Sequence, residues 1–152
     1  MKILVLGSGA REHAIIKALI RTGTKPSDVY CAPGNGGISA EVACVPLKPA
    51  SPKEVAEWAS RNQIELVVIG PEAPLVAGVS DALRTLGIPV FGPSQKAAQL
   101  EGSKSFAKEV MAAADVPTGM AKQCSTLEEV AEALDNFGSP YVVKADGLAA
   151  GK

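Results

Sequence analysis

The chain has 152 residues, of which 47% are hydrophobic and 20% charged, so it has room for one ordinary domain, or for one domain and the start of another. Fifteen basic side chains against sixteen acidic ones leave a net charge of −1, which provides no basic stripe for a nucleic-acid backbone. The apolar runs fall far short of the roughly 20 residues that a membrane-spanning helix needs. We therefore expect neither a nucleic-acid partner nor a membrane partner.

Two features predict a cytoplasmic protein. The N-terminus enters an apolar segment directly after Met1 and Lys2, without the three-part pattern of a secretory signal. Cys31, Cys44 and Cys124 are odd in number and far apart, which is typical of reduced thiols. With one histidine and no CxxC pair, the chain also lacks a zinc pattern, and we expect no metal ligands within it.

Short β-branched runs alternate with segments of helical period over the first hundred residues or so. In chain order they predict a strand at 3–6, a helix at 10–21, strands at 29–32 and 42–47, a helix at 52–62, a strand at 66–69, a helix at 75–86 and a strand at 89–91. This rhythm is typical of an open, parallel, doubly wound α/β sheet of Rossmann-like type. Strands 3–6 and 66–69 carry apolar side chains at successive positions, which predicts central places covered by helices on both faces.

The pattern changes after Phe91. Helices are expected at 97–100 and 103–114, and a capping box at Thr126 begins another helix that ends at Gly138 and precedes a strand at 141–144. That last helix is expected to bury an apolar stripe of Leu127, Val130, Leu134 and Phe137. We place a domain boundary near residue 100, giving domains at 1–100 and 101–152. Because about fifty residues with so few elements cannot easily close a core, we expect the second domain to be incomplete.

Four predicted strands end in glycine or proline turns, at 7–9, 33–37, 70–72 and 92–94. The carboxyl ends of strands in an open parallel sheet face the ligand crevice, so these turns should line one rim. Glycine lets backbone N–H groups approach an anion, and the following helix start adds a partial positive charge. Tight turning alone is the alternative at any single position, but four corresponding turns favour a binding rim.

For three side chains near this rim, a functional role is weighed against a structural one. Arg11, at the start of the first helix, could pair with a phosphate, and a solvated surface arginine is the alternative. Glu72, after the central strand, could hold an amine, and a helix N-terminal acid favoured by the dipole is the alternative. His13 is interpreted as a hydrogen-bonded helix residue rather than a catalytic base.

The first turn only partly matches a dinucleotide fingerprint. Glu12 stands where the third glycine of Gly7-x-Gly9-x-x-Gly belongs, and the second strand ends without the acid that would hold a ribose. A nicotinamide-dependent Rossmann oxidoreductase is therefore one alternative. A noncatalytic domain that senses a sugar phosphate or a nucleotide is another.

The C-terminal residues 142–152 combine a predicted strand, Lys144 and a glycine-bearing loop. The spacing does not fit a P-loop, because position 146 is Asp rather than Gly. We interpret the loop as a flap over nucleotide phosphates, with Lys144 as a point charge. A strand lysine with its amine in solvent is the alternative.

Five segments together give the chain a family resemblance. They are VLGSGAREH at 5–13, APGN at 32–35, VIGPEAPL at 68–75, LEGSK at 100–104 and VVKADGLAAGK at 142–152. In these segments the sequence resembles the phosphoribosylamine–glycine ligases, or glycinamide ribonucleotide synthetases, of the ATP-grasp superfamily. Ala10 departs from the glycine usual at its position. The resemblance covers the whole chain and implies a pre-ATP-grasp domain at 1–100 followed by the first part of an ATP-grasp domain.

The resemblance implies an enzyme of purine biosynthesis, a carbon–nitrogen ligase. It would join glycine to 5-phosphoribosylamine with ATP and Mg²⁺, through a glycyl phosphate, and yield glycinamide ribonucleotide, ADP and phosphate. The resemblance assigns to the phosphoribosylamine side Gly9, Arg11, Glu12, Pro33, Gly34, Asn35, Gly70, Pro71 and Glu72. It assigns to ATP the residues Lys104, Lys144, Gly147 and Gly151. No catalytic residue is expected in these 152 residues and the metal ligands are expected downstream, so the chain alone should be inactive, with the remainder of its own chain as a partner.

Overall fold

The computed structural model describes residues 1–148, and the chain divides into two compact units, Met1–Ala98 and Gln99–Lys152. Residues 149–152, among them the predicted ATP-binding Gly151, lie outside the described part. Every helix within residues 1–148 is too short or too polar to cross a bilayer.

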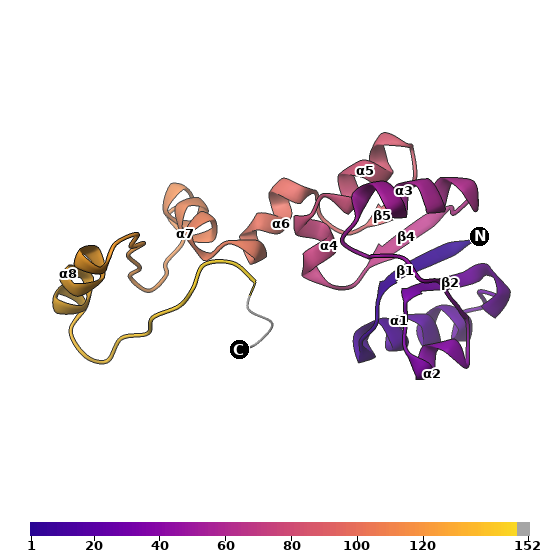
Figure 1. The fold of residues 1–152 in the computed structure, drawn as a ribbon, viewed down its shortest axis with the longest axis horizontal. Coiled ribbons are helices and arrows are strands. Elements are labelled where there is room, and N and C mark those ends of the chain that lie inside the picture. Colours follow the sequence, from indigo (N-terminus) through magenta and orange to yellow (C-terminus); the bar gives the residue numbers. More distant parts are fainter. Residues whose placement is uncertain (149–152) are drawn as a thin grey trace. The chain divides into compact units, whose positions relative to one another are not determined.

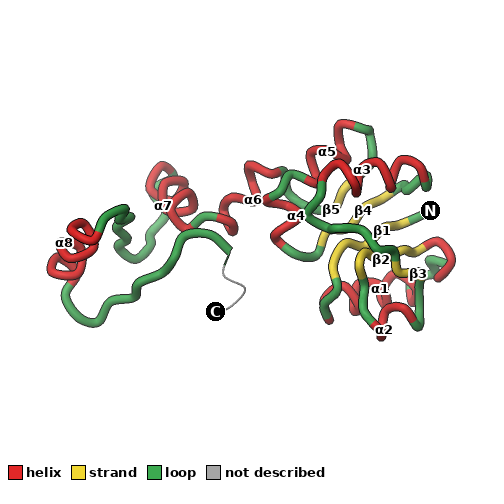
Figure 2. Tube along the Cα trace, viewed as in Figure 1, coloured by secondary structure: helices red, strands yellow, loops and turns green. Residues whose placement is uncertain are grey.

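The first unit is an open sheet of five parallel strands in the order β3-β2-β1-β4-β5 (Figures 1 and 2). Its elements are β1 (Ile3–Gly7), α1 (Ala10–Arg21), the 3-10 helix η1 (Pro26–Asp28), β2 (Val29–Pro33), α2 (Gly36–Ser39), β3 (Ala43–Cys44), α3 (Pro52–Arg61), β4 (Leu66–Ile69), α4 (Glu72–Val76), α5 (Val79–Thr85) and β5 (Val90–Phe91). The predicted fold class, an open parallel doubly wound sheet, is confirmed. The short helices η1 and α2 were not predicted.

Helices cover both faces of this sheet, with α1 and α2 on one face and α3, α4 and α5 on the other (Figure 1). All five residues of β1 are buried. Leu4 and Leu6 belong to the hydrophobic cluster of α3 and α5, whereas Ile3 and Val5 belong to the cluster of α1 and α2. Each such side chain contributes roughly 1.5–3 kcal/mol when fully buried, which explains why β1 is apolar at successive positions.

The prediction of a single helix at 75–86 is wrong. The structure has α4 and α5 instead, separated at Gly78, whose φ of 89° lies in the left-handed region. Glycine adopts this conformation without the steric cost that a Cβ brings, so the apolar period continues while the helix axis breaks. The strand predicted at 42–47 is also reduced to the two residues of β3.

Helices supply all the regular structure of the second unit among its described residues (Figure 2). Helix α6 (Gln95–Gly102) contains the division between the units, and α7 (Lys104–Ala113) and α8 (Leu127–Phe137) follow. The capping box at Thr126 is confirmed, because its Oγ1 accepts the Glu129 N–H at 3.2 Å while Glu129 Oε2 accepts the Thr126 N–H at 3.3 Å.

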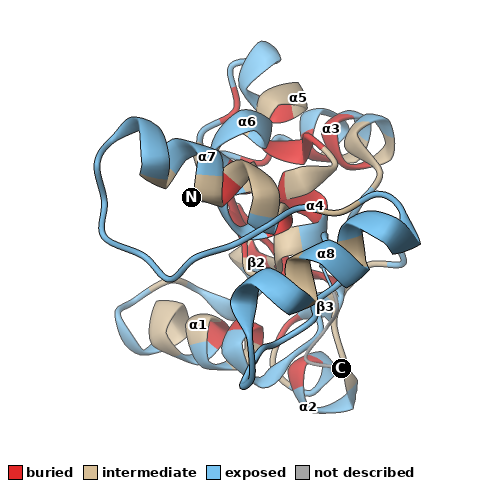
Figure 3. Ribbon diagram, turned by 90° about the vertical axis from the view of Figure 1, so that its left-hand side faces the viewer, coloured by how far each residue is buried: buried red, intermediate tan, exposed pale blue. Residues whose placement is uncertain are grey.

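Two predictions for this unit are wrong. The strand expected at 141–144 does not form, since a strand needs a neighbour for its backbone N–H and C=O groups and no described residue of this unit supplies one. The apolar stripe of α8 is not buried either, because no residue of α8 is buried (Figure 3). Leu127 is 83% exposed. An amphipathic helix buries its stripe only where another element faces it.

Candidate functional site

Three of the four predicted turns meet at the carboxyl edge of the sheet. Gly7 pairs with Pro33 across β1 and β2, and Leu6 pairs with Ile69 across β1 and β4. The Gly34 N–H donates to the Gly7 carbonyl at 3.1 Å, and the Gly70 N–H donates to the Leu6 carbonyl at 3.2 Å. The turns after β1, β2 and β4 therefore form one continuous rim.

Two open hollows lie along this rim, of about 270 Å³ and about 460 Å³, and they share Gly9, Glu12 and Pro71. The smaller is also lined by Ala10, Arg11 and Glu72. The larger is also lined by Gly7, Ser8, Pro33, Pro49, Ala50, Ala73 and Pro74. The fourth predicted turn, at 92–94, lines neither hollow.

Sequence reasoning did not single out Pro49 and Ala50. They precede α3, in the connection that follows the edge strand β3. In a parallel sheet every strand-to-helix connection leaves from the carboxyl edge, so this topological rule could have placed them at the rim.

Glu12 is a buried carboxylate, only 4% exposed, between the ends of β1 and β4. Its Oε2 accepts the Gly9 N–H at 2.7 Å. A Cβ on Gly70 would overlap the Glu12 carboxyl group, and a Cβ on Gly7 would lie 2.6 Å from Glu12 Cδ. The two glycines thus make the space that the glutamate fills, which explains why the third fingerprint glycine is absent.

This arrangement argues against a nicotinamide dinucleotide. The N–H groups of the first turn in a dinucleotide fold face the pyrophosphate. Here the Gly9 N–H is bound by the Glu12 carboxylate instead, and a second anion at the same N–H would meet that negative charge.

Arg11 and Glu72 lie together at the smaller hollow. Arg11 Nη1 donates to the Gly70 carbonyl at 2.7 Å and lies 3.5 Å from Glu72 Oε1. The two side chains are 64% and 44% exposed, so their attraction contributes little to stability. Arg11 is thus held against the turn after β4 rather than extended into solvent, and its remaining N–H groups can meet an anion.

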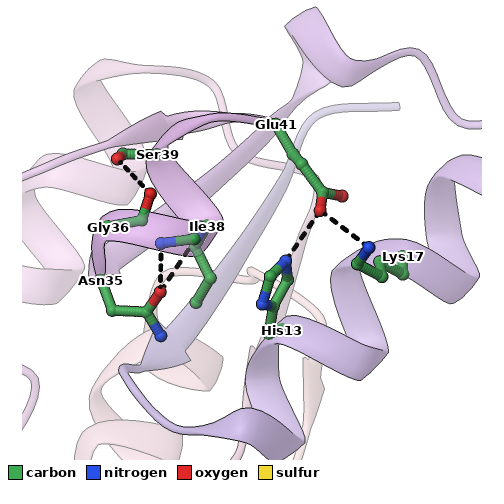
Figure 4. A network of polar contacts seen from close by, with 8 residues as sticks. His13, Lys17, Asn35, Gly36, Ile38, Ser39 and Glu41 are labelled. Atoms are coloured by element: carbon green, nitrogen blue, oxygen red, sulfur yellow. Dashed lines mark hydrogen bonds and ion pairs between the residues drawn. The ribbon is translucent and has the colours of Figure 1, made fainter.

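Asn35 shapes the rim rather than reaching into a hollow. Its Oδ1 accepts the N–H groups of Gly37 at 2.9 Å and Ile38 at 3.0 Å, which caps α2 (Figure 4). Its Nδ2 donates to the Ser8 carbonyl at 2.8 Å and so ties the β2 turn to the β1 turn. An asparagine before two glycines is a recognisable helix cap, a signal that could have predicted this structural role.

Gly34 and His13 also have structural partners near the rim. Gly34 has a φ of 74°, and a Cβ there would overlap Cys44 Sγ. His13 Nε2 lies 2.8 Å from Glu41 Oε1, which Lys17 Nζ approaches to 3.1 Å (Figure 4). The hydrogen bond from His13, followed by the one from Lys17, lowers the pKa of Glu41. The hydrogen bond predicted for His13 is confirmed, and His13 lines neither hollow.

The predicted ATP-binding residues lie in the second unit. Lys104 is the first residue of α7, and its Nζ donates to the Gly147 carbonyl at 2.7 Å. Lys144 is exposed and has no polar side-chain partner within residues 1–148. In that same part of the chain, no group of three or more His, Cys, Asp and Glu side chains is placed to hold a metal ion.

An open parallel sheet with hollows at its carboxyl edge defines the first unit as a doubly wound, ligand-binding α/β domain. The chain belongs to the phosphoribosylglycinamide synthetase family: the N domain of that family matches residues 1–101, and its ATP-grasp (A) domain matches residues 102–152. The family resemblance of the five segments is thereby confirmed.

Individual relatives agree with this assignment. The phosphoribosylamine–glycine ligases of Leifsonia xyli subsp. xyli and Streptomyces coelicolor are 64% and 55% identical to the chain and match 100% of it. The chain spans 36% of the length of each of these two relatives.

Solved structures show the same architecture. The crystal structure of the phosphoribosylamine–glycine ligase of Thermotoga maritima matches 100% of this chain and 34% of its own, with a TM-score of 0.78 and 34% identity. The biotin carboxylase domain of the Hydrogenobacter thermophilus 2-oxoglutarate carboxylase matches 91% of this chain and 33% of its own, with a TM-score of 0.70 and 22% identity. The second likeness shows the fold alone.

Proposed function

We propose that this chain is the N-terminal part of an ATP-dependent ligase that joins glycine to 5-phosphoribosylamine. The products would be glycinamide ribonucleotide, ADP and phosphate, a step of purine biosynthesis. The observation that carries the proposal is the rim hollow walled by Glu12, Arg11 and Glu72, in a chain that matches one ligase family along both of its units. Residues 1–100 would bind the sugar substrate, and residues 101–152 would begin the ATP-grasp domain.

The rim offers complementary charges to phosphoribosylamine. Glu12 occupies the Gly9 N–H, but the next N–H groups, those of Ala10 and Arg11, begin α1 without an intrahelical partner and carry a partial positive charge. The unused side-chain N–H groups of Arg11 extend that positive character toward a phosphate. The Glu72 carboxylate is available to the substrate amine. The remaining substrate-side residues would shape the rim and hold its turns together, namely Gly9, Glu12, Pro33, Gly34, Asn35, Gly70 and Pro71.

The proposed reaction has two chemical steps, which is why it needs one region for the sugar substrate and another for ATP. A carboxylate is a poor acylating group, so phosphoryl transfer from ATP converts glycine to glycyl phosphate. The sugar amine then attacks its carbonyl carbon, forms the C–N bond and releases phosphate. Most of the acceleration in such transfers comes from positioning and charge neutralisation.

Lys104, Lys144 and Gly147 would contact the phosphates of ATP, as would Gly151, which lies outside the described residues. Mg²⁺, when bound, would neutralise charge on the same phosphates. The family resemblance places its ligands downstream, and we assign no residue of this chain to the metal. We propose a cytoplasmic location, supported by Cys31, Cys44 and Cys124, which are all free thiols.

Calorimetric titration of ribose 5-phosphate into the 152-residue chain tests the substrate side. Arg11→Ala should weaken binding by about 1–3 kcal/mol, the scale of a charge-assisted hydrogen bond. Arg21→Ala is the matched control, because Arg21 is an exposed arginine in the last turn of the same helix. Equal affinity of Arg11→Ala and wild type would remove Arg11 from the site, and binding of NAD⁺ in place of the sugar phosphate would overturn the proposal.

An activity assay tests the reaction itself. The complete ligase that carries this chain should release ADP only when ATP, glycine and phosphoribosylamine are all present. The 152-residue chain alone should form no product, because it spans 36% of its relatives and leaves α8 without a buried face. Product formation by the short chain would show that the catalytic groups lie within it.

A further inference from the structure

The carboxylate of Asp146 accepts four hydrogen bonds although its residue is exposed. Oδ1 accepts the N–H of Lys104 at 2.6 Å and that of Gly147 at 3.0 Å. Oδ2 accepts the hydroxyl of Ser105 at 2.5 Å and that of Ser103 at 3.0 Å. Three of these donors belong to the start of α7. One side chain therefore joins that helix to the start of the glycine-bearing loop, here called the glycine loop, of which residues 146–148 are described.

The start of α7 is suited to hold this carboxylate. Ser103 is the N-cap, and its Oγ accepts the Phe106 N–H at 3.1 Å. The first turn of a helix carries a partial positive charge that favours a nearby anion. The hydroxyl of Ser105, followed by the N–H of Lys104, holds the pKa of Asp146 well below its usual range, so the carboxylate is ionised and can accept these hydrogen bonds at physiological pH.

The side chain of Lys104 also links α7 to the glycine loop, but in this contact the side chain belongs to the helix and the acceptor belongs to the loop. Its Nζ donates to the Gly147 carbonyl at 2.7 Å, while its N–H donates to Asp146. A lysine has a long flexible stem, which loses rotamer freedom when its ammonium group is fixed. Fastening the loop beside α7 therefore also restricts where the Lys104 ammonium group lies.

We propose that Asp146 is a positioning residue, which fastens the start of the glycine loop to the first turn of α7 and holds the Lys104 ammonium group beside that loop. The link to nucleotide binding rests on the function proposed above. In that setting Asp146 does not touch ATP. It prearranges Lys104 and residues 146–148, so that less conformational entropy is lost when the phosphates bind.

Hydrogen exchange of single amides in the 152-residue chain tests the fastening. Asp146→Asn keeps the shape of the side chain but removes its charge and replaces one acceptor by a donor. We expect the Lys104 amide to exchange about tenfold faster in this variant, the change that loss of about 1.4 kcal/mol produces. Ser105→Ala, which removes one donor only, should give a smaller change in the same direction.

Asp135→Asn is the matched control, because Asp135 is an exposed aspartate of α8 in the same unit. It should leave the Lys104 amide unchanged. The Glu129 amide, which Thr126 Oγ1 holds, reports whether the unit keeps its structure in each variant. An unchanged Lys104 amide in Asp146→Asn, or the same acceleration in Asp135→Asn, would overturn the proposal.

Kinetics of the complete ligase test the consequence for ATP. Asp146→Asn should raise the KM for Mg·ATP by about fivefold or more and change kcat by less than about twofold, the pattern of lost uniform binding. The KM for glycine should stay the same. An unchanged KM for Mg·ATP, or an equal rise for glycine, would contradict a positioning role. A wild-type ligase without activity would reject the proposed function, and the exchange experiment would still decide whether Asp146 fastens the loop.

Discussion

Replacing Gly70 by alanine tests whether Glu12 owes its buried place to the missing side chain at the end of β4. The new Cβ would overlap the Glu12 carboxyl oxygen and lie 2.7 Å from Cδ and 2.9 Å from Cγ. Gly70 is not among the glycines with positive φ, so its backbone tolerates alanine. The three atoms nearest to the new Cβ all belong to the Glu12 side chain.

The expected cost follows from what Glu12 loses when it moves. Its hydrogen bond from the Gly9 N–H, 2.7 Å long, is charge-assisted and is worth about 1.5–3 kcal/mol. Alanine has less conformational freedom than glycine in the unfolded chain, which stabilises the folded state by about 0.4–1 kcal/mol. We expect the free energy of unfolding to fall by about 1–2 kcal/mol, within the range found for overpacked sites.

Urea unfolding followed by Trp58 fluorescence measures this cost. Trp58 is the single tryptophan and packs edge-on against Tyr30 in the first unit, with ring centroids 5.5 Å apart, so it reports the unfolding of that unit. Gly36→Ala is the control, because outside its chain neighbours and the backbone of its own helix no atom lies within 4 Å of a Cβ at Gly36, and it should not destabilise.

A double-mutant cycle with Glu12→Ala tests whether the loss of stability in Gly70→Ala comes from the conflict between the new Cβ and Glu12. Once the glutamate is truncated, Gly70→Ala should no longer destabilise and should keep only the gain of about 0.4–1 kcal/mol. The coupling energy is then about 1.5–3 kcal/mol, the full value of the lost hydrogen bond. Equal destabilisation by Gly70→Ala with and without Glu12, within about 0.5 kcal/mol, would show additive sites and refute the steric argument.

Two further predictions concern titrating groups. Burial, together with the neighbouring Cys44 and Glu12, raises the pKa of Cys31 to about 12; iodoacetamide at about pH 8 should therefore leave Cys31 unmodified in the folded protein and label it in urea, and labelling at equal rates would contradict its burial. The hydrogen bond from His13, then that from Lys17, lowers the pKa of Glu41 below its ordinary 4.5, so its contribution to stability is complete above that value and is lost as the pH falls through the lower folded pKa. The thermal stability of Glu41→Gln should accordingly decline less than that of wild type between about pH 6 and pH 3, and parallel declines in Tm would count against the interaction.

Much of the first unit was predictable from local patterns. Successive apolar residues at 3–6 and 66–69 indicated central strands, and both became buried neighbours in the sheet. The parallel topology then placed the turns after β1, β2 and β4 at one edge, because parallel strands all end on the same side. The break at Gly78 was missed, since the apolar period of a helix continues across a single left-handed residue.

The sequence by itself determined most of the helices and strands of the first unit, though not η1, α2 or the break between α4 and α5, and it determined that the turns share an edge. Apolar period, capping and glycine placement act over a few residues. Only the tertiary structure decided that Gly7 and Gly70 make room for Glu12, that Asn35 Nδ2 donates to the Ser8 carbonyl, and that Asp146 binds the start of α7. It also decided that Leu127 and residues 141–144 have no facing element among the described residues of their unit. Burial and hydrogen bonding depend on atoms that are distant along the chain, and no local pattern specifies where those atoms lie.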